Sequence, residues 1–77
     1  MTLSEAIKVA RQKALMSQED FAKAIDVSLV SVNRWECGKS RPNLTAMKAI
    51  KRFCECNRLP YEDIEKEWIS HSTEENK

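Results

Sequence analysis

Residues 17–42 have the sequence SQEDFAKAIDVSLVSVNRWECGKSRP, which indicates two short helices joined by a tight turn. Apolar residues recur at intervals of three and four on both sides of the turn at Ile25–Ser28, as they do on the buried face of a helix. In the second helix, Val32 and Trp35 mark the buried side and leave the opposite side without bulky core residues. A short helix with one open side fits the major groove of B-DNA, so this stretch favours nucleic-acid binding.

Side chains that cap helix ends indicate where the helices begin. Thr2 and Glu5 have the T-x-x-E spacing of a capping box at the start of a first helix. Ser17 and Ser28 stand where a hydroxyl can accept a hydrogen bond from the first turn of the second and third helices. Gly38 can take the left-handed conformation that ends the third helix. The apolar stripe of the first helix consists of Leu3, Ile7, Ala10 and Ala14.

The sequence after Pro42 predicts two more helices. Asn43 caps the fourth, and the break at residues 57–60 ends it, with Pro60 in the first turn of the fifth. The side chains expected to face inwards from the fourth helix are Leu44, Met47, Ile50 and Phe53. Those on one face of the fifth helix are Tyr61, Ile64 and Trp68. We therefore predict an all-α, compact five-helix domain over residues 1–69 and a disordered acidic tail over residues 70–77.

The composition fits one small helical domain that binds a polyanion. The chain has 77 residues, with one Gly and two Pro. Residues 1–60 hold 11 Lys and Arg against six Asp and Glu, and residues 61–77 hold two against six. A basic body suits a polyanion, although the net charge of +1 carries little weight alone.

Other classes of protein are disfavoured. No stretch approaches the ~20 apolar residues that span a bilayer, and the first five residues lack the parts of a signal peptide. We expect a cytoplasmic protein, nucleoid-associated when bound to DNA, with no membrane partner. The odd number of cysteines, Cys37, Cys54 and Cys56, gives no disulfide framework, and no C-x-x-C or His pair suggests zinc. We expect reduced thiols and no metal.

The motif residues together resemble the DNA-binding domain of phage repressors, Cro proteins and their bacterial relatives, the xenobiotic-response-element-like helix-turn-helix family. The matching residues are Arg11, Ser17-Gln18, Phe21-Ala22, Val27-Ser28, Trp35-Glu36, Gly38-Lys39 and Pro42. The likeness extends to about Ile64 and implies a lambda-repressor-like fold. Two positions depart from the pattern, because Leu15 and Asp26 stand where the family usually has Gly. Asp tolerates the left-handed conformation, but Leu does not, so we expect the turn at Leu15 to be built differently.

The resemblance also implies how the domain contacts DNA. The expected base-reading residues, on a helix over residues 28–36, are Ser28, Leu29, Val30, Asn33 and Arg34. The expected phosphate contacts are Gln18, Lys39, Ser40 and Arg41. Asn33 suits adenine, and Arg34 suits guanine or a phosphate. Leu29 and Val30 can pack on thymine methyl groups or form a patch that binds another protein.

Two further residues have a structural role in the family. Arg11 and Glu36 match a partly buried ion pair that joins the first helix to the end of the third. Trp35 is expected in the core rather than at a ligand site. Ile64, Trp68 and Ile69 can pack on the first helix or form the seam of a dimer, and the sequence does not choose between them.

These expectations combine into a sequence-specific transcriptional regulator, most simply a small repressor, that binds double-stranded DNA as a homodimer without a cofactor or small-molecule ligand. The alternative is a protein-interaction module, such as an antitoxin or co-regulator with the same fold. An enzyme is not expected, because the chain has one His, His71, and neither paired carboxylates in a cleft nor a Gly-rich phosphate loop can be argued.

Overall fold

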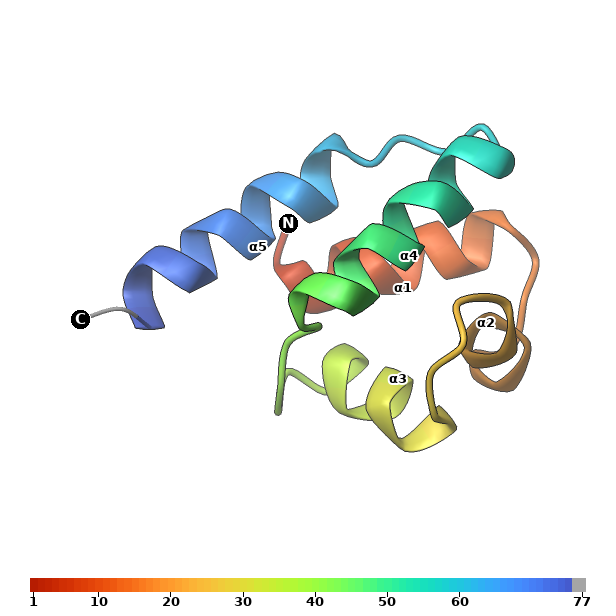
Figure 1. The fold of residues 1–77 in the computed structure, drawn as a ribbon, viewed down its shortest axis with the longest axis horizontal. Helices are drawn as coiled ribbons and strands as arrows, with labels where there is room; N and C mark the ends of the chain where they lie inside the picture. Colours follow the sequence, from red (N-terminus) through yellow and green to blue (C-terminus); the bar gives the residue numbers. More distant parts are fainter. Residues whose placement is uncertain (76–77) are drawn as a thin grey trace.

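Five helices make up the regular structure of residues 1–75, the part of the backbone that the computed structural model describes. They are α1 (Leu3–Lys13), α2 (Gln18–Ala24), α3 (Leu29–Glu36), α4 (Leu44–Cys56) and α5 (Glu62–Glu75). Figure 1 shows α2 and α3 on one side of α1 and α4, with α5 on the other side. The predicted all-α, five-helix class is confirmed. Within these residues, no helix is both long and apolar enough to cross a membrane.

The capping side chains begin the helices as the sequence predicts. The Thr2 hydroxyl accepts from the Glu5 backbone N–H at 3.2 Å, and the Glu5 carboxylate accepts from the Thr2 N–H at 2.9 Å, so the capping box is complete. Side-chain oxygens of the residues before α2, α3 and α4 each accept from a backbone N–H three residues on, and these residues are Ser17, Ser28 and Asn43. Local sequence therefore sets where the first four helices begin.

Four helices end in the same way, with a residue of positive φ and two closing hydrogen bonds. At the end of α1, Leu15 N–H donates to the Gln12 carbonyl at 2.9 Å and Met16 N–H donates to the Arg11 carbonyl at 3.3 Å, which is a Schellman motif. The equivalent bonds close α2, α3 and α4. The residues of positive φ are Leu15 (60°), Asp26 (58°), Gly38 (75°) and Arg58 (56°).

The expectation for Leu15 was wrong. This residue takes the left-handed conformation that its β-carbon disfavours, rather than a different turn. The two closing hydrogen bonds hold the backbone there, and the side chain is 93% exposed. Asp26 and Gly38 take the left-handed conformation as expected, whereas Arg58 was not anticipated.

A core of apolar side chains from all five helices fills the space between them. Phe21 and Phe53 meet edge to face, with ring centroids 5.0 Å apart. The prediction that Leu44 faces inwards was wrong, because its side chain is 59% exposed. At about 100° per residue, Leu44 lies roughly 120° from the centre of the buried stripe of α4. Ala46 and Cys54 complete that stripe instead.

Helix α5 packs its predicted apolar face on its own chain. Ile64 is buried and contacts the core, and Trp68 is half-buried against it. The indole Nε1 of Trp68 donates to the Pro42 carbonyl at 2.6 Å. Of the three residues considered for a dimer seam, Ile69 is exposed, at 53%.

The start of α5 differs from the prediction. Pro60 precedes the helix by two residues instead of occupying its first turn. A hydrogen bond from Glu65 N–H to the carbonyl of Tyr61, the residue before the helix, closes the first turn. The helical backbone also continues past Ile69, the expected end of the domain, to Glu75. The last two residues of the expected tail, 76–77, lie outside the described residues.

Candidate nucleic-acid interface

Helix α3 has one buried face and one exposed face. Val32 is fully buried and Trp35 is 5% exposed, which places both in the core as expected. On the other face, Leu29 is 46% exposed and Val30 is 67% exposed. Asn33 and Arg34 are also exposed, so these four candidate base-reading residues share one accessible surface. Helix α2 packs beside α3 and supports it (Figure 1).

Ser28, the fifth candidate base-reading residue, also caps α3. Its hydroxyl accepts from the Ser31 N–H at 3.1 Å and donates to Ser31 Oγ at 3.0 Å. The side chain is exposed at the start of α3, but its hydroxyl already caps the helix. This bonding makes Ser28 first of all a determinant of where α3 begins.

An ion pair ties α1 to the end of α3. Arg11 donates from Nε to Glu36 Oε2 at 2.7 Å and from Nη2 to Glu36 Oε1 at 2.9 Å, so the expected pair forms in a two-pronged geometry. Arg11 Nη1 also donates to the Met16 carbonyl at 2.9 Å. The two charged side chains are 12% and 5% exposed, and the pair therefore fixes α3 from behind.

The environment of Glu36 keeps its carboxylate ionised. Burial raises the pKa of Glu36, but hydrogen bonds from Arg11 and Gln18 and the positive charges of Arg11 and Lys8 lower it, and the result lies below the ordinary value of 4.5. For Arg11, the hydrogen bond to Glu36 raises the pKa above its ordinary value. Both groups are charged at neutral pH.

Gln18 lies at the start of α2, where it can reach both the ion pair and the exposed face of α3. Its Nε2 donates to Glu36 Oε1 at 3.1 Å, and its Oε1 accepts from Asn33 Nδ2 at 3.4 Å. Family resemblance predicts a phosphate contact for Gln18, and neither of these two bonds was predicted from the sequence, because the three residues are far apart in the chain. One amide hydrogen of Gln18 remains for a phosphate oxygen.

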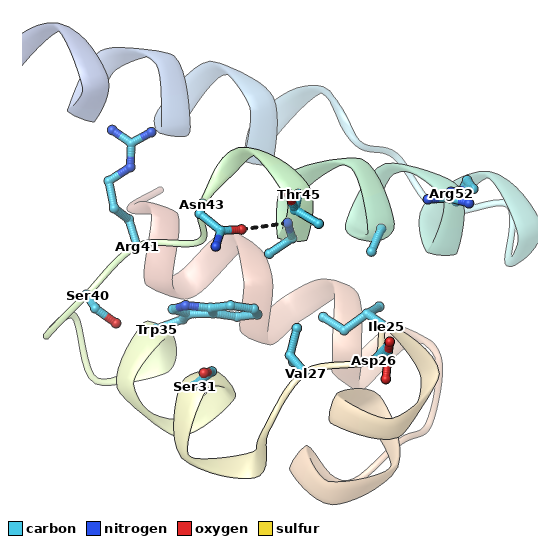
Figure 2. Close-up of a pocket in the computed structure, with 12 residues that line it drawn as sticks. Ile25, Asp26, Val27, Ser31, Trp35, Ser40, Arg41, Asn43, Thr45 and Arg52 are labelled. Carbon is cyan, nitrogen blue, oxygen red and sulfur yellow. Dashed lines mark hydrogen bonds between the residues drawn. The ribbon is translucent and has the colours of Figure 1, made fainter.

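The expected phosphate contacts after α3 are not all together. Lys39 and Ser40 are exposed in the loop that follows Gly38. The Arg41 guanidinium instead lies 4.2 Å from the centroid of the Trp68 ring, and Figure 2 shows its side chain extending towards α5. Such a cation–π contact is favourable, so in this structure the Arg41 guanidinium helps to hold α5 in place.

A shallow pocket of about 500 Å³ lies between α3, the following loop and α4 (Figure 2). Ser31 and Trp35 line it from α3, Asn43 lines it from the position before α4, and Arg52 lines it from α4. Asn43 uses its Oδ1 to cap α4, so this lining residue also serves the fold. Arg52 is exposed on α4, and no functional role was predicted for it from the sequence.

Little in the described residues suggests catalysis or metal binding. Among them, no group of three or more His, Cys, Asp or Glu side chains is placed to hold a metal ion. Burial, followed by the nearby charge of Glu55, raises the pKa of Cys54 to about 11, so this thiol is a poor nucleophile at neutral pH. Cys37 and Cys56 are exposed.

The sequence of residues 7–58 matches the family described as helix-turn-helix, which covers well over half of the chain and the whole α2–α3 unit. The chain belongs to this Cro/C1-type helix-turn-helix family. Proteins of the family bind DNA and are not enzymes. No solved structure shows a significant match to the chain.

Two curated relatives carry the same kind of domain. The chain is 33% identical over 57 residues to the HTH-type transcriptional regulator DicA of Escherichia coli, which is 74% of this chain and 42% of DicA. It is 32% identical over 53 residues to the HTH-type transcriptional activator BcrR of Enterococcus faecalis, which is 69% of this chain and 26% of BcrR. The chain thus matches less than half the length of each relative.

Proposed function

We propose that this helix-turn-helix protein is a sequence-specific DNA-binding transcriptional regulator that places α3 in the major groove. The observation that carries the proposal is the division of α3 into a buried face and an exposed face, with Asn33 and Arg34 on the exposed one. A capped helix held from behind by an ion pair can enter the groove without rearranging. Family membership supports the same reading.

Each exposed side chain of α3 can make a contact with the edge of a base in the major groove. Asn33 can donate to and accept from adenine, and Arg34 can donate to guanine or to a phosphate. Leu29 and Val30 can cover thymine methyl groups. Ser28 lies at the end of the helix that enters the groove and can contact DNA while it caps α3.

Phosphate contacts would fix the position of the domain on the duplex. Gln18 at the start of α2 and Lys39 and Ser40 after α3 flank the reading helix in the chain and are our candidates. Arg41 joins them only if its guanidinium leaves the Trp68 ring.

We further propose that two copies bind a near-palindromic operator, because one domain reads a single half-site. Ile69 is the exposed candidate for their contact, whereas Ile64 and Trp68 pack on their own chain. We also propose repression in the cytoplasm, at the nucleoid, because a domain that covers a promoter blocks it without any further contact. One relative is named an activator, so the sign of control needs its own reporter assay.

Selection of bound sequences from a random duplex pool tests the function directly. We expect enrichment of a short motif with two half-sites about one helical turn apart. Light scattering of the free protein and of an Ile69→Ala variant tests the contact between copies. A pool that stays random after repeated rounds at low salt would refute sequence-specific binding.

A protein-interaction module is the second candidate, and one observation favours it. Leu29 and Val30 form an exposed apolar pair at the front of α3. In that case Leu29→Ser with Val30→Ser abolishes capture of a partner protein, while heparin retention of the parent is weak and insensitive to salt.

A further inference from the structure

A single hydrogen-bonded chain links the partly buried ion pair to the exposed face of α3. It begins at Glu36 Oε1, which accepts from Arg11 Nη2 at 2.9 Å and from Gln18 Nε2 at 3.1 Å. It continues through Gln18 Oε1, which accepts from Asn33 Nδ2 at 3.4 Å. The first member is 5% exposed and the last is exposed, so the chain connects the interior with the candidate reading surface.

The charge of Glu36 fixes the direction of every bond in this chain. An ionised carboxylate only accepts hydrogen bonds, so Gln18 must present its NH2 group to it. The side-chain carbonyl oxygen of Gln18 is then turned towards Asn33, which must donate a hydrogen bond to it from its own NH2 group. Rotating either amide by half a turn would bring two oxygen atoms face to face. Each amide therefore has one favourable orientation.

The fixed orientation decides what Asn33 can offer to a base. One Nδ2 hydrogen is used by Gln18, which leaves one donor, and the carbonyl oxygen receives a weak contact from Cys37 Sγ at 3.8 Å. Adenine presents an acceptor and a donor, N7 and the N6 amino group, in the major groove. Guanine presents two acceptors there, so the Asn33 oxygen would oppose guanine O6.

We propose that Gln18 and Glu36 are positioning residues that hold the Asn33 amide in the orientation that selects adenine. This inference rests on the proposed function and extends it to the base read by one side chain. Neither Gln18 nor Glu36 contacts that base. They act through Asn33, and the ion pair with Arg11 thereby has a role in specificity as well as in stability.

The test measures base discrimination, because a phosphate contact and a positioning contact affect it differently. Dissociation constants are measured for the selected duplex and for duplexes changed at each base pair in turn. We expect Asn33→Ala to lower discrimination at one A·T pair by about tenfold. Gln18→Ala lowers affinity for all duplexes and, in addition, lowers discrimination at that same pair by about threefold or more.

Two controls isolate the effect. Lys39→Ala lowers affinity uniformly and leaves discrimination at every pair unchanged. In the Asn33→Ala background, Gln18→Ala causes no further loss of discrimination, because the side chain that it positions is gone. In the free protein, the two side-chain amide proton signals of Asn33 move closer together in Gln18→Ala, whereas the signals of Asn43 stay in place.

The outcomes separate the inference from the proposed function. A parent protein without sequence preference refutes both. A specific parent in which Asn33→Ala relaxes one pair, but Gln18→Ala only weakens binding uniformly, refutes the inference and keeps the function. A specific parent in which Asn33→Ala relaxes no pair also refutes the inference. Loss of discrimination at one shared pair in both variants supports it.

Discussion

At the scale of single residues, Leu15 shows how a hydrogen-bond pattern can override a conformational preference. Its φ of 60° lies within the range of 56° to 75° found at the four helix ends, although Leu has a β-carbon that opposes it. The Leu15 side chain is almost fully exposed, so its packing offsets little of this conformational cost. This position therefore costs the folded state about 1–2 kcal/mol relative to a residue without a β-carbon.

We predict that Leu15→Gly stabilises the protein by about 0.5–1 kcal/mol. Relief of the left-handed strain exceeds the greater backbone entropy of Gly in the unfolded chain. Urea unfolding followed by circular dichroism measures the change. Ala14→Gly is the matched control, because Ala14 has a right-handed φ of −82° and should lose stability. A lower midpoint for Leu15→Gly than for the parent would contradict the assignment of strain.

Glu36 is a residue through which pH should act on stability. Its pKa in the folded protein lies below the ordinary value of 4.5, so folding favours the ionised form. The resulting stabilisation is fully present above about pH 4.5 and is lost as the pH falls through the lower, folded pKa. Glu36→Gln removes this dependence.

We predict that the free energy of unfolding of the parent falls more steeply below pH 4.5 than that of Glu36→Gln. At pH 7 the Glu36→Gln variant should be less stable by about 3 kcal/mol, because Arg11 keeps its charge without an anionic partner. Replacing Arg11 and Glu36 together by Met should cost less than this single change. The control is Glu5→Gln. Hydrogen bonds from Thr2 also lower the pKa of this exposed carboxyl, but Glu5 is not part of the Arg11–Glu36 pair. Parallel pH profiles for parent and Glu36→Gln would count against the role of the pair.

At the scale of elements, α5 is held to the loop between α3 and α4 by Trp68. Its indole N–H donates to the Pro42 carbonyl, and the Arg41 guanidinium covers its ring. The loop also carries Lys39 and Ser40, so α5 stabilises a segment that we propose for DNA contact. Packing of α5 thus connects stability with function.

We predict that Trp68→Phe lowers the free energy of unfolding by about 1–2 kcal/mol. The hydrogen bond to Pro42 is lost, and the phenyl ring makes a weaker cation–π contact with Arg41. Tyr61→Phe, at the residue just before α5, is the matched control. Its hydroxyl reaches the Met47 carbonyl at 3.4 Å, compared with 2.6 Å for Trp68, so its loss should matter less. Equal effects of the two substitutions in urea unfolding would show that the Pro42 bond adds nothing.

Elements with a local signal could be predicted from the sequence, and contacts between distant residues could not. The caps at Thr2, Ser17 and Ser28 depend on residues three positions apart, which the sequence displays directly. Leu44 was misplaced because an apolar residue at a helix start satisfies a stripe pattern without facing the core. The Arg41–Trp68 contact joins residues from different elements, and no local pattern indicates it.

The candidate site shows the same division. The exposed face of α3 followed from the positions of Val32 and Trp35, and the Arg11–Glu36 pair followed from family resemblance. The bond between Gln18 and Asn33 depends on how α2 and α3 are placed relative to each other, and on which end of each amide faces the other. Those quantities appear only in three dimensions.

At the scale of the whole molecule, the charges are divided between the body and the last helix. Lys and Arg exceed Asp and Glu over residues 1–60, whereas the reverse holds for residues 61–77. A polyanion should therefore approach the surface that carries Lys39 and avoid α5, where Lys66 lies among acidic residues. Binding then depends on salt through a small number of phosphate contacts.

We predict that Lys39→Ala reduces the slope of log affinity against log salt by about 0.9 for each copy bound to the operator, because one phosphate contact is lost per copy. A reduction of about 1.8 thus indicates two copies, and about 0.9 indicates one. Lys66→Ala is the control, since it removes the same charge from α5 and should leave the slope unchanged. Fluorescence anisotropy of a labelled duplex at several salt concentrations gives both slopes. If Lys66→Ala changed the slope and Lys39→Ala did not, the DNA would lie against α5, and the orientation of α3 in the groove would have to be abandoned.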